Sequence, residues 1–287
     1  MSSTAEAIQP RVNIAPASNL ALWARQVRAI VAFDLRRNFF GKRSLLVYLL
    51  ALMPIALLLL VALVNPGRQD NSAQLPIIYS IFYNSLILRT IVFFGCAWIF
   101  MNLFRGEIVD RSLHYYFLSA VRREVVVAGK YLSGLLTSII LFTIVTVVCM
   151  LLTFFPHYYS SSLRFFFEGP GLGQLFWYTT ITILACVGYG AFFIVVGLFV
   201  RNPIIPALLL YGWEWINFLL PPLLKKISVI HYLNSLVPVP VSEGPFAVVA
   251  EPTPAWLSIP GLLIVTALVL FVAGTRIRRM EIRYGSE

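Results

Sequence analysis

The chain has 287 residues, of which 59% are apolar and only 12% are charged. Soluble domains are about 45–50% apolar and about 25% charged, so this composition excludes a soluble enzyme, a nucleic-acid-binding domain and a disordered chain. The formal net charge of +10 is explained by the Lys and Arg excess that orients membrane proteins. We therefore predict an integral membrane protein that contacts the lipid bilayer and no nucleic acid.

Six apolar stretches approach the length of about 20 residues that a helix needs to cross a bilayer. They are long and continuous, unlike the alternating strands of a β-barrel. The predicted spans are residues 44–64, a stretch within 77–104, and residues 131–155, 175–200, 203–220 and 257–275. The fold class is thus all-α, with six transmembrane helices over residues 44–275. The first span reads as an uncleaved signal anchor, because its apolar run begins only at residue 44.

Lys and Arg residues are unevenly divided between the two sides of these spans. Seventeen lie in residues 1–43, in the links after the second and fourth spans, and in the C-terminal tail, whereas four lie in the other links. This bias predicts that both termini are cytoplasmic and that residues 276–287 form a cytoplasmic tail. An even number of spans agrees, and we expect a multi-pass protein of the cell (inner) membrane.

The N-terminal segment divides in two. Residues 1–17 are small and polar and predict a disordered tail, whereas residues 18–43 predict an amphipathic helix at the membrane interface. Its apolar face holds Leu20, Trp23, Val27, Ile30 and Val31, and its opposite face holds Arg25, Arg28 and Arg36.

We assign Trp23, Arg25 and Arg28 as interfacial anchors, with the Trp ring at the headgroup level and the arginines toward anionic lipid. Asp34 falls near the centre of the apolar face, so the membrane-lying part is expected to end before it. The helix is either a simple anchor for the first span or an elbow packed against neighbouring spans.

The link between the second and third spans, about residues 105–130, carries charges of both signs and an aromatic cluster. A docking surface for a cytoplasmic protein needs both features, whereas a basic retention loop needs only the positive charges. Both interpretations stay open. The candidate contact residues are Glu107, Asp110, Arg111, Ser112, Leu113, Tyr115 and Tyr116.

This link resembles that of the membrane subunits of type-two ABC exporters. Their motif has an acidic residue after span two and then a G/S-T/S-L sequence, followed by Pro/Ala-V-S/R-R and by G-K at the start of span three. The matching residues are Glu107, Arg111-Ser112-Leu113, Ala120-Val121-Arg122-Arg123 and Gly129-Lys130. Arg111 replaces the frequent Gly, and Ala120 replaces the usual Pro. The resemblance extends to the N-terminal elbow, the six spans and a long Pro-rich external link at about residues 221–256.

The resemblance implies that the link is a coupling helix seated in a cleft of an ATPase. It also implies a dimer with a second copy of this chain or a paralogue, and two ABC ATPase subunits that bind ATP and Mg. The external link would form short helices that re-enter the outer leaflet. The sequence itself has no Walker A loop, because Gly129-Lys130 lacks the upstream glycine. We therefore expect no cofactor and no enzymatic activity in this chain.

Two ionisable residues fall at membrane depth, Arg89 in the second span and Glu214 in the fifth. Each would cost about 2.5–3.5 kcal/mol at the bilayer centre. One interpretation is a structural pair that joins the two spans, flanked by Trp213 and Trp215. The other is that one of them lines a substrate path.

No catalytic constellation or metal site is predicted. The three histidines are far apart, and Cys96, Cys149 and Cys186 lie inside spans without metal-ligand spacing, which predicts small apolar packing residues. The leading prediction is thus an ABC exporter permease. The alternative is a secondary transporter or channel subunit without an ATPase, although such proteins often show internal repeats that we do not find here.

Overall fold

The computed structural model describes residues 19–42, 44–64, 74–109, 121–154, 160–200, 204–217, 221, 228–240 and 254–278. These residues form helices and turns and contain no strand. In chain order the helices are α1 (Asn19–Phe40), α2 (Ser44–Val64), α3 (Leu75–Phe82), η1 (Tyr83–Val92), α4 (Phe93–Val109), α6 (Arg123–Phe154), α7 (Ser160–Phe167), α8 (Gly171–Phe199), α9 (Ile204–Ile216), α11 (Val229–Asn234) and α12 (Ala255–Arg278). The predicted all-α class is confirmed for the described part of the chain.

In the part of the chain that the structure describes, five helices are long and apolar enough to cross a membrane, namely Ser44–Val64, Leu75–Gly106, Arg123–Phe154, Gly171–Phe199 and Ala255–Thr275. The predicted fifth span is shorter than expected among the described residues, because α9 has only 13 residues. Such a helix is about 20 Å long at 1.5 Å per residue, short of the roughly 30 Å hydrocarbon core. The described residues therefore contain five helices of spanning length and one shorter apolar helix.

The second predicted span is one continuous helix made of α3, η1 and α4. Its middle part, Tyr83–Val92, is a π-helix. A π-helical turn is wider than an α-helical turn, and such segments frequently occur at functional sites. Arg89 lies in this segment.

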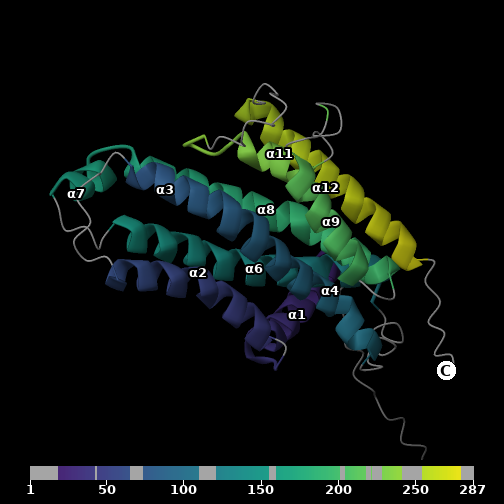
Figure 1. The fold of residues 1–287 in the computed structure, drawn as a ribbon. Helices are drawn as coiled ribbons and strands as arrows, with labels where there is room; N and C mark the ends of the chain where they lie inside the picture. The colour runs from purple at the N-terminus through teal and green to yellow at the C-terminus, as the bar shows by residue number, and fades with distance from the viewer. Residues whose placement is uncertain are drawn as a thin grey trace, which may run out of the picture.

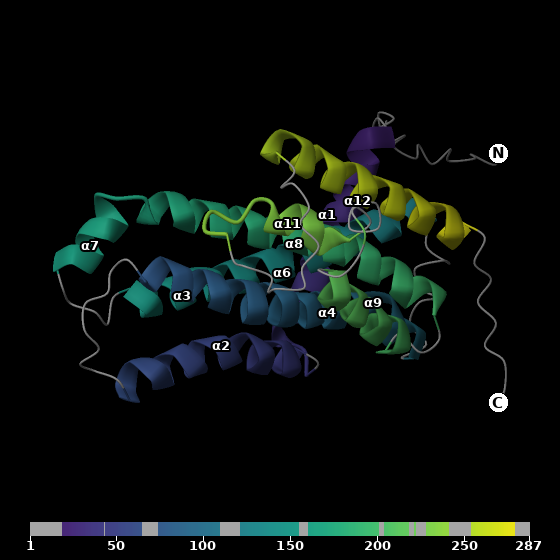
Figure 2. The ribbon, with the colours of Figure 1, turned by 45° about the horizontal axis from the view of Figure 1, so that its top comes forward.

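The helices cross the bundle in alternating directions (Figure 1). α7 lies at one end of the bundle, and α1 and the C-terminal end of α12 lie toward the other end (Figures 1 and 2). α8 and α12 run in the same direction (Figure 2). The chain between them must therefore return toward the α7 end, and α9 makes only the first part of that return.

The centre of the bundle is formed by the α3–η1–α4 helix and α8. In the most apolar part of these two helices, 67% and 72% of the stretch is buried inside the protein. The corresponding shares for α2 and α12 are only 17% and 22%. The exposed side chains of α2 and α12 are mostly Leu, Ile, Val and Phe. In water such surfaces would be unfavourable, and this supports a membrane environment for the two outer helices.

Close contact between α4 and α8 depends on two glycines of α8. A Cβ atom at Gly197 would lie 3.1 Å from Met101 Cα, and one at Gly190 would overlap the Phe100 ring. Small residues let membrane helices approach closely where no hydrophobic effect drives them together. Gly190 and Gly197 are seven residues apart and so share one helix face.

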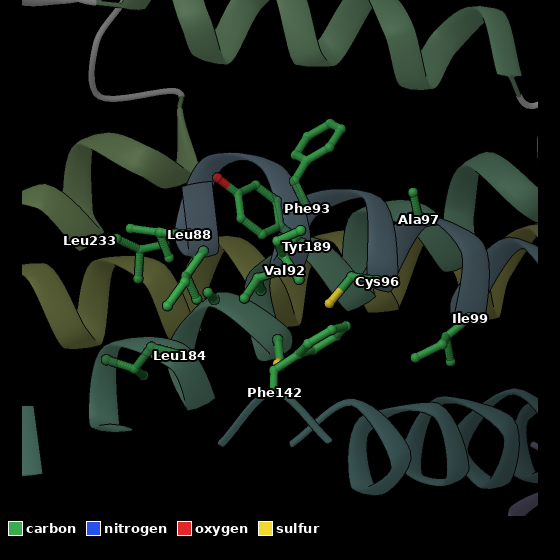
Figure 3. Packing of buried hydrophobic residues seen from close by; sticks show 14 of the residues in the cluster. Leu88, Val92, Phe93, Cys96, Ala97, Ile99, Phe142, Leu184, Tyr189 and Leu233 are labelled. Carbon is green, nitrogen blue, oxygen red and sulfur yellow. The ribbon is translucent and has the colours of Figure 1, made fainter. Parts of the chain in front are cut away.

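Aromatic side chains fill the space around the π-helix. Phe93 packs edge-on against Tyr189 and Phe193, with ring centroids 5.2 and 5.0 Å apart. Figure 3 shows Phe93 and Tyr189 beside Val92 and Cys96 in this cluster. Such edge-to-face pairs contribute about 0.5–1.5 kcal/mol beyond area burial. This packing holds the π-helical segment, and with it Arg89, in a fixed position.

The orientation of the bundle can be tested by thiol labelling in intact cells. The Lys and Arg distribution predicts that a cysteine at position 226 reacts with an impermeant maleimide, and that one at position 122 reacts only after permeabilisation. The native Cys96, Cys149 and Cys186 are buried, so they give little background labelling. The reverse pattern would show that the predicted sides are exchanged.

Candidate functional sites

The segment predicted to contact an ATPase lies between α4 and α6. Glu107 belongs to the end of α4, but its side chain is outside the described residues. The other candidates also lie outside them: Asp110, Arg111, Ser112, Leu113, Tyr115 and Tyr116. Partner contact by these seven residues stays a prediction. The structure does describe the start of α6, which follows the segment, and the helix α1 that packs on α6.

α1 packs along the first half of α6 in a regular register. The contacts are the Arg122 guanidinium 4.8 Å from the Trp23 ring centroid, Ile30 against Gly129, and Asn38 Nδ2 donating to Thr137 Oγ1 at 3.3 Å. The residue numbers rise together and differ by the same amount in each pair. The two helices therefore run in the same direction over about four turns.

A buried ion pair lies inside this α1–α6 interface. Lys130 Nζ is 3.4 Å from Asp34 Oδ2, and the two side chains are 0% and 2% exposed. The same ammonium group lies 5.5 Å from the ring centroid of Phe104. Removal of two charges from water is costly, and attraction in the low-dielectric interior compensates only when the geometry is favourable. Neither charge is tolerable there without the other.

Asp34 lies inside α1, which continues to Phe40. Lys130 supplies the opposite charge at the point where the carboxylate meets α6. That the membrane-lying part of the helix ends before Asp34 stays a prediction. The face around Asp34 is occupied by protein, which is the arrangement that the elbow interpretation expects. The position of α1 at the membrane surface stays a prediction.

The three predicted interfacial anchors fall into two environments. Trp23 is half-buried, and the Arg122 guanidinium covers its ring. Arg25 and Arg28 are exposed on the opposite face of α1. Trp23 thus contacts Arg122, the residue before α6, through a cation–π interaction, while lipid contact by Arg25 and Arg28 stays a prediction.

Glu214 is 3% exposed and accepts three hydrogen bonds from one short segment. Ser228 Oγ donates to Oε2 at 2.6 Å, Ile230 N donates to Oε2 at 3.2 Å, and Val229 N donates to Oε1 at 3.2 Å. These donors stand at the start of α11, where backbone N–H groups lack partners within the helix. Glu214 thus caps α11 from another helix and fixes it against the bundle.

Arg89 lies beside the helix that carries Glu214, because its guanidinium is 5.7 Å from the ring centroid of Trp215, the next residue along the chain. A structural pair between Arg89 and Glu214 stays a prediction. Arg89 is half-buried and Trp215 is 41% exposed. A partly exposed cation within a span should face water or another protein rather than lipid.

Hydroxyl groups form a buried network that the sequence did not predict. The Tyr83 hydroxyl is 2.9 Å from Thr182 Oγ1, which is 3.1 Å from Thr146 Oγ1. The Tyr79 hydroxyl donates to the Thr146 carbonyl at 3.0 Å. Single Tyr and Thr residues in apolar spans give no sequence signal for such a network, because their partners are on other helices. The network joins η1, α3, α6 and α8 through polar contacts inside the bundle.

Cys96, Cys149 and Cys186 are buried and free, and they belong to the apolar core. This confirms the interpretation of these cysteines as packing residues. Among the described residues, no group of three or more His, Cys, Asp or Glu side chains is arranged to hold a metal ion.

Comparison with known proteins gives no further assignment. No family model matches the chain, and no curated protein matches it significantly. The resemblance to type-two ABC exporters thus depends on the motif between Glu107 and Lys130 and on the pattern of helices.

Proposed function

We propose that this chain is the membrane subunit of an ATP-driven exporter of the type-two ABC class. The observation that carries the proposal is that three residues in the second half of the motif contact α1. Arg122 covers Trp23, Gly129 admits Ile30, and Lys130 pairs with Asp34. The motif residues therefore connect the proposed coupling segment to the N-terminal helix. Movement of that segment against an ATPase would reach α1 and then α2 directly.

In this proposal the coupling contact comes from Glu107 and from residues 110–113, 115 and 116, and ATP and Mg bind to a separate chain. Six spans with both termini in the cytoplasm would require α9 and the residues after it to complete the short fifth crossing. Two copies, or one copy and a paralogue, would assemble with two ATPase subunits.

The half-buried Arg89 and the exposed Trp215 mark a face for that assembly. A membrane-facing cation needs a protein or aqueous neighbour, and the Trp side chain beside it suits an interface. The face formed by η1 and α9 would then lie against the second copy or against a hydrophilic substrate path.

Affinity purification from the native membrane tests the proposal. We expect the tagged chain to purify with an ABC ATPase and to support ATP hydrolysis. Glu107→Lys should reduce recovery of the ATPase about tenfold or more, because reversal of an interfacial charge replaces attraction with repulsion and costs several kcal/mol. Glu168→Lys is the matched control, since Glu168 is exposed beside α7 at the opposite end of the bundle (Figure 1).

Equal recovery of the ATPase with both variants would show that Glu107 does not contact the ATPase. Transport by the purified chain alone, driven by an ion gradient and insensitive to ATP, would contradict the proposal and support the secondary transporter or channel alternative.

A further inference from the structure

A cavity of about 240 Å³ lies where α1, α2 and α4 meet. It is formed at the turn from α1 into α2, and α4 supplies the opposite wall. Most of its lining surface is apolar, and the apolar side chains that form it are Val47, Trp98, Ile99 and Leu103. A cavity with walls of this kind suits an apolar ligand better than it suits water, because ordered water needs polar partners.

The polar side chains of the lining have other partners inside the protein or lie at its surface. The Asp34 carboxylate is paired with an ammonium group of α6 at 3.4 Å, and Arg37 interacts with another group of the protein. Asn38 donates to a hydroxyl of α6 at 3.3 Å, and the Ser44 hydroxyl donates to a carbonyl of α1 at 3.1 Å. Lys42 is exposed. A charged ligand is therefore not needed to satisfy this wall.

The volume of the cavity limits the size of a ligand. An engineered apolar cavity of about 150 Å³ in another protein stays dry and binds benzene. In proportion, a cavity of about 240 Å³ accommodates about eight to ten carbon atoms. This is the size of a short alkyl chain or of two fused rings, and it is much smaller than a phospholipid with two acyl chains.

One polar group of the α4 wall is positioned to orient such a ligand. Asn102 Nδ2 donates to the Trp98 carbonyl at 2.8 Å, which fixes the amide. An amide nitrogen carries two hydrogens, so the second can be donated to an oxygen atom of a ligand. The apolar wall is rigid as well, because Val47, Ile99 and Leu103 are only 6%, 6% and 5% exposed. A preformed site lowers the entropic cost of binding.

We propose that this cavity binds an uncharged amphiphile with an apolar body of about eight to ten carbons and one hydroxyl or carbonyl group. The body packs against Trp98, Val47 and Leu103, and the oxygen accepts a hydrogen bond from the Asn102 amide. Such a ligand contacts the α1–α2 turn and α4 at the same time and joins them. The proposal does not depend on a transport function, because it uses only the lining of the cavity.

Fluorescence quenching of Trp98 in the detergent-solubilised full chain tests the proposal. The probe is 10-bromodecan-1-ol, whose bromine quenches tryptophan on contact. The chain has six tryptophans, so the difference between the natural protein and Trp98→Phe isolates the signal of Trp98. We expect this signal to be quenched saturably, and we expect 1-decanol to reverse the quenching whereas 1-butanol, at the same mole fraction in the detergent, does not.

A cavity-filling substitution locates the site. Val47→Phe should abolish the saturable quenching, because the added ring occupies the cavity. Val61→Phe is the matched control, since Val61 is on the same helix and is 43% exposed, and it should leave the quenching unchanged. If Val47→Phe does not fold, Ile99→Phe fills the cavity from α4 and decides in the same way. If Trp98→Phe does not fold, the quenching that 1-decanol reverses is the readout.

Three results would overturn the proposal. Quenching that rises in proportion to the probe without saturation would show partition into the detergent alone. Unchanged quenching in the cavity-filling variant, or an equal loss in Val61→Phe, would place the probe elsewhere. Decanoate that reverses the quenching at a much lower concentration than 1-decanol would show that the site selects a charged ligand.

Discussion

Lys130→Met should destabilise the protein by about 3–5 kcal/mol, as expected when one partner of a buried ion pair is removed. The substitution leaves the Asp34 carboxylate buried against α6 without its ammonium partner at 3.4 Å. Asp34→Leu should have a similar effect, because it leaves Lys130 buried and charged. The measurement is the free energy of unfolding in detergent, together with the folded yield after purification.

The double variant Asp34→Leu/Lys130→Met provides the decisive comparison. Apolar replacement of both members of a buried pair is often neutral, so the double variant should recover most of the loss. A double-mutant cycle gives the coupling energy directly. Arg36→Gln on the exposed face of α1 is the matched control and should leave stability unchanged. Simple additivity of the two single effects would show that Asp34 and Lys130 do not stabilise each other.

Glu214→Ala should destabilise the protein by at least about 3 kcal/mol, because hydrogen bonds to a charged group contribute about 1.5–3 kcal/mol each. It removes the acceptor for Ser228, Val229 and Ile230 at once and leaves two backbone N–H groups without their partner. Ser228→Ala removes one donor to the charged group and should cost about 1.5–3 kcal/mol. Faster hydrogen exchange at Val229 and Ile230 should accompany the loss, because α11 is no longer capped.

A second cycle separates this role from the pair that the sequence predicted. If Arg89 were the main partner of Glu214, Arg89→Met/Glu214→Leu would recover most of the stability lost by Glu214→Leu. The three hydrogen bonds from α11 lead us to expect little recovery, because Arg89→Met restores none of them. Recovery of most of the loss would show that the direct charge pair dominates. Unchanged stability with impaired transport in Arg89→Met would place Arg89 in the substrate path.

The sequence was sufficient to locate the helices but not to predict which segments pack against each other. Apolar stretches of about 20 residues identify spans because few other structures satisfy backbone hydrogen bonds in lipid, and five predicted spans match long helices. The described part of the fifth, α9, has only 13 residues, so a sixth full-length span stays a prediction. The burial of Glu214 followed from its position in an apolar stretch. Its donors did not, because they lie in a separate segment 14 to 16 positions away, and the sequence does not show where that segment packs.

Asp34 and Lys130 illustrate the same limit for charges. Asp34 interrupts an apolar helix face, and the sequence predicts only that the membrane-lying part of the helix ends before it. Lys130 was interpreted only as part of a motif. Each residue alone is a charge on an apolar helix face. The presence of each is explained by the other residue, 96 positions away in the sequence. Pairing between distant segments requires a register, and the constant spacing between α1 and α6 becomes visible only when both helices are placed.

The α1–α6 register also sets an order for membrane insertion. α6 is synthesised after α1, α2 and α4, and it enters the membrane with Lys130 near its start. α1, already made, carries the Asp34 carboxylate that pairs with this ammonium group inside the bundle. We therefore expect α6 to reach its final position only after α1 has docked. A chain that begins at Ser44 would retain all five long apolar helices and would leave Lys130 stranded during assembly.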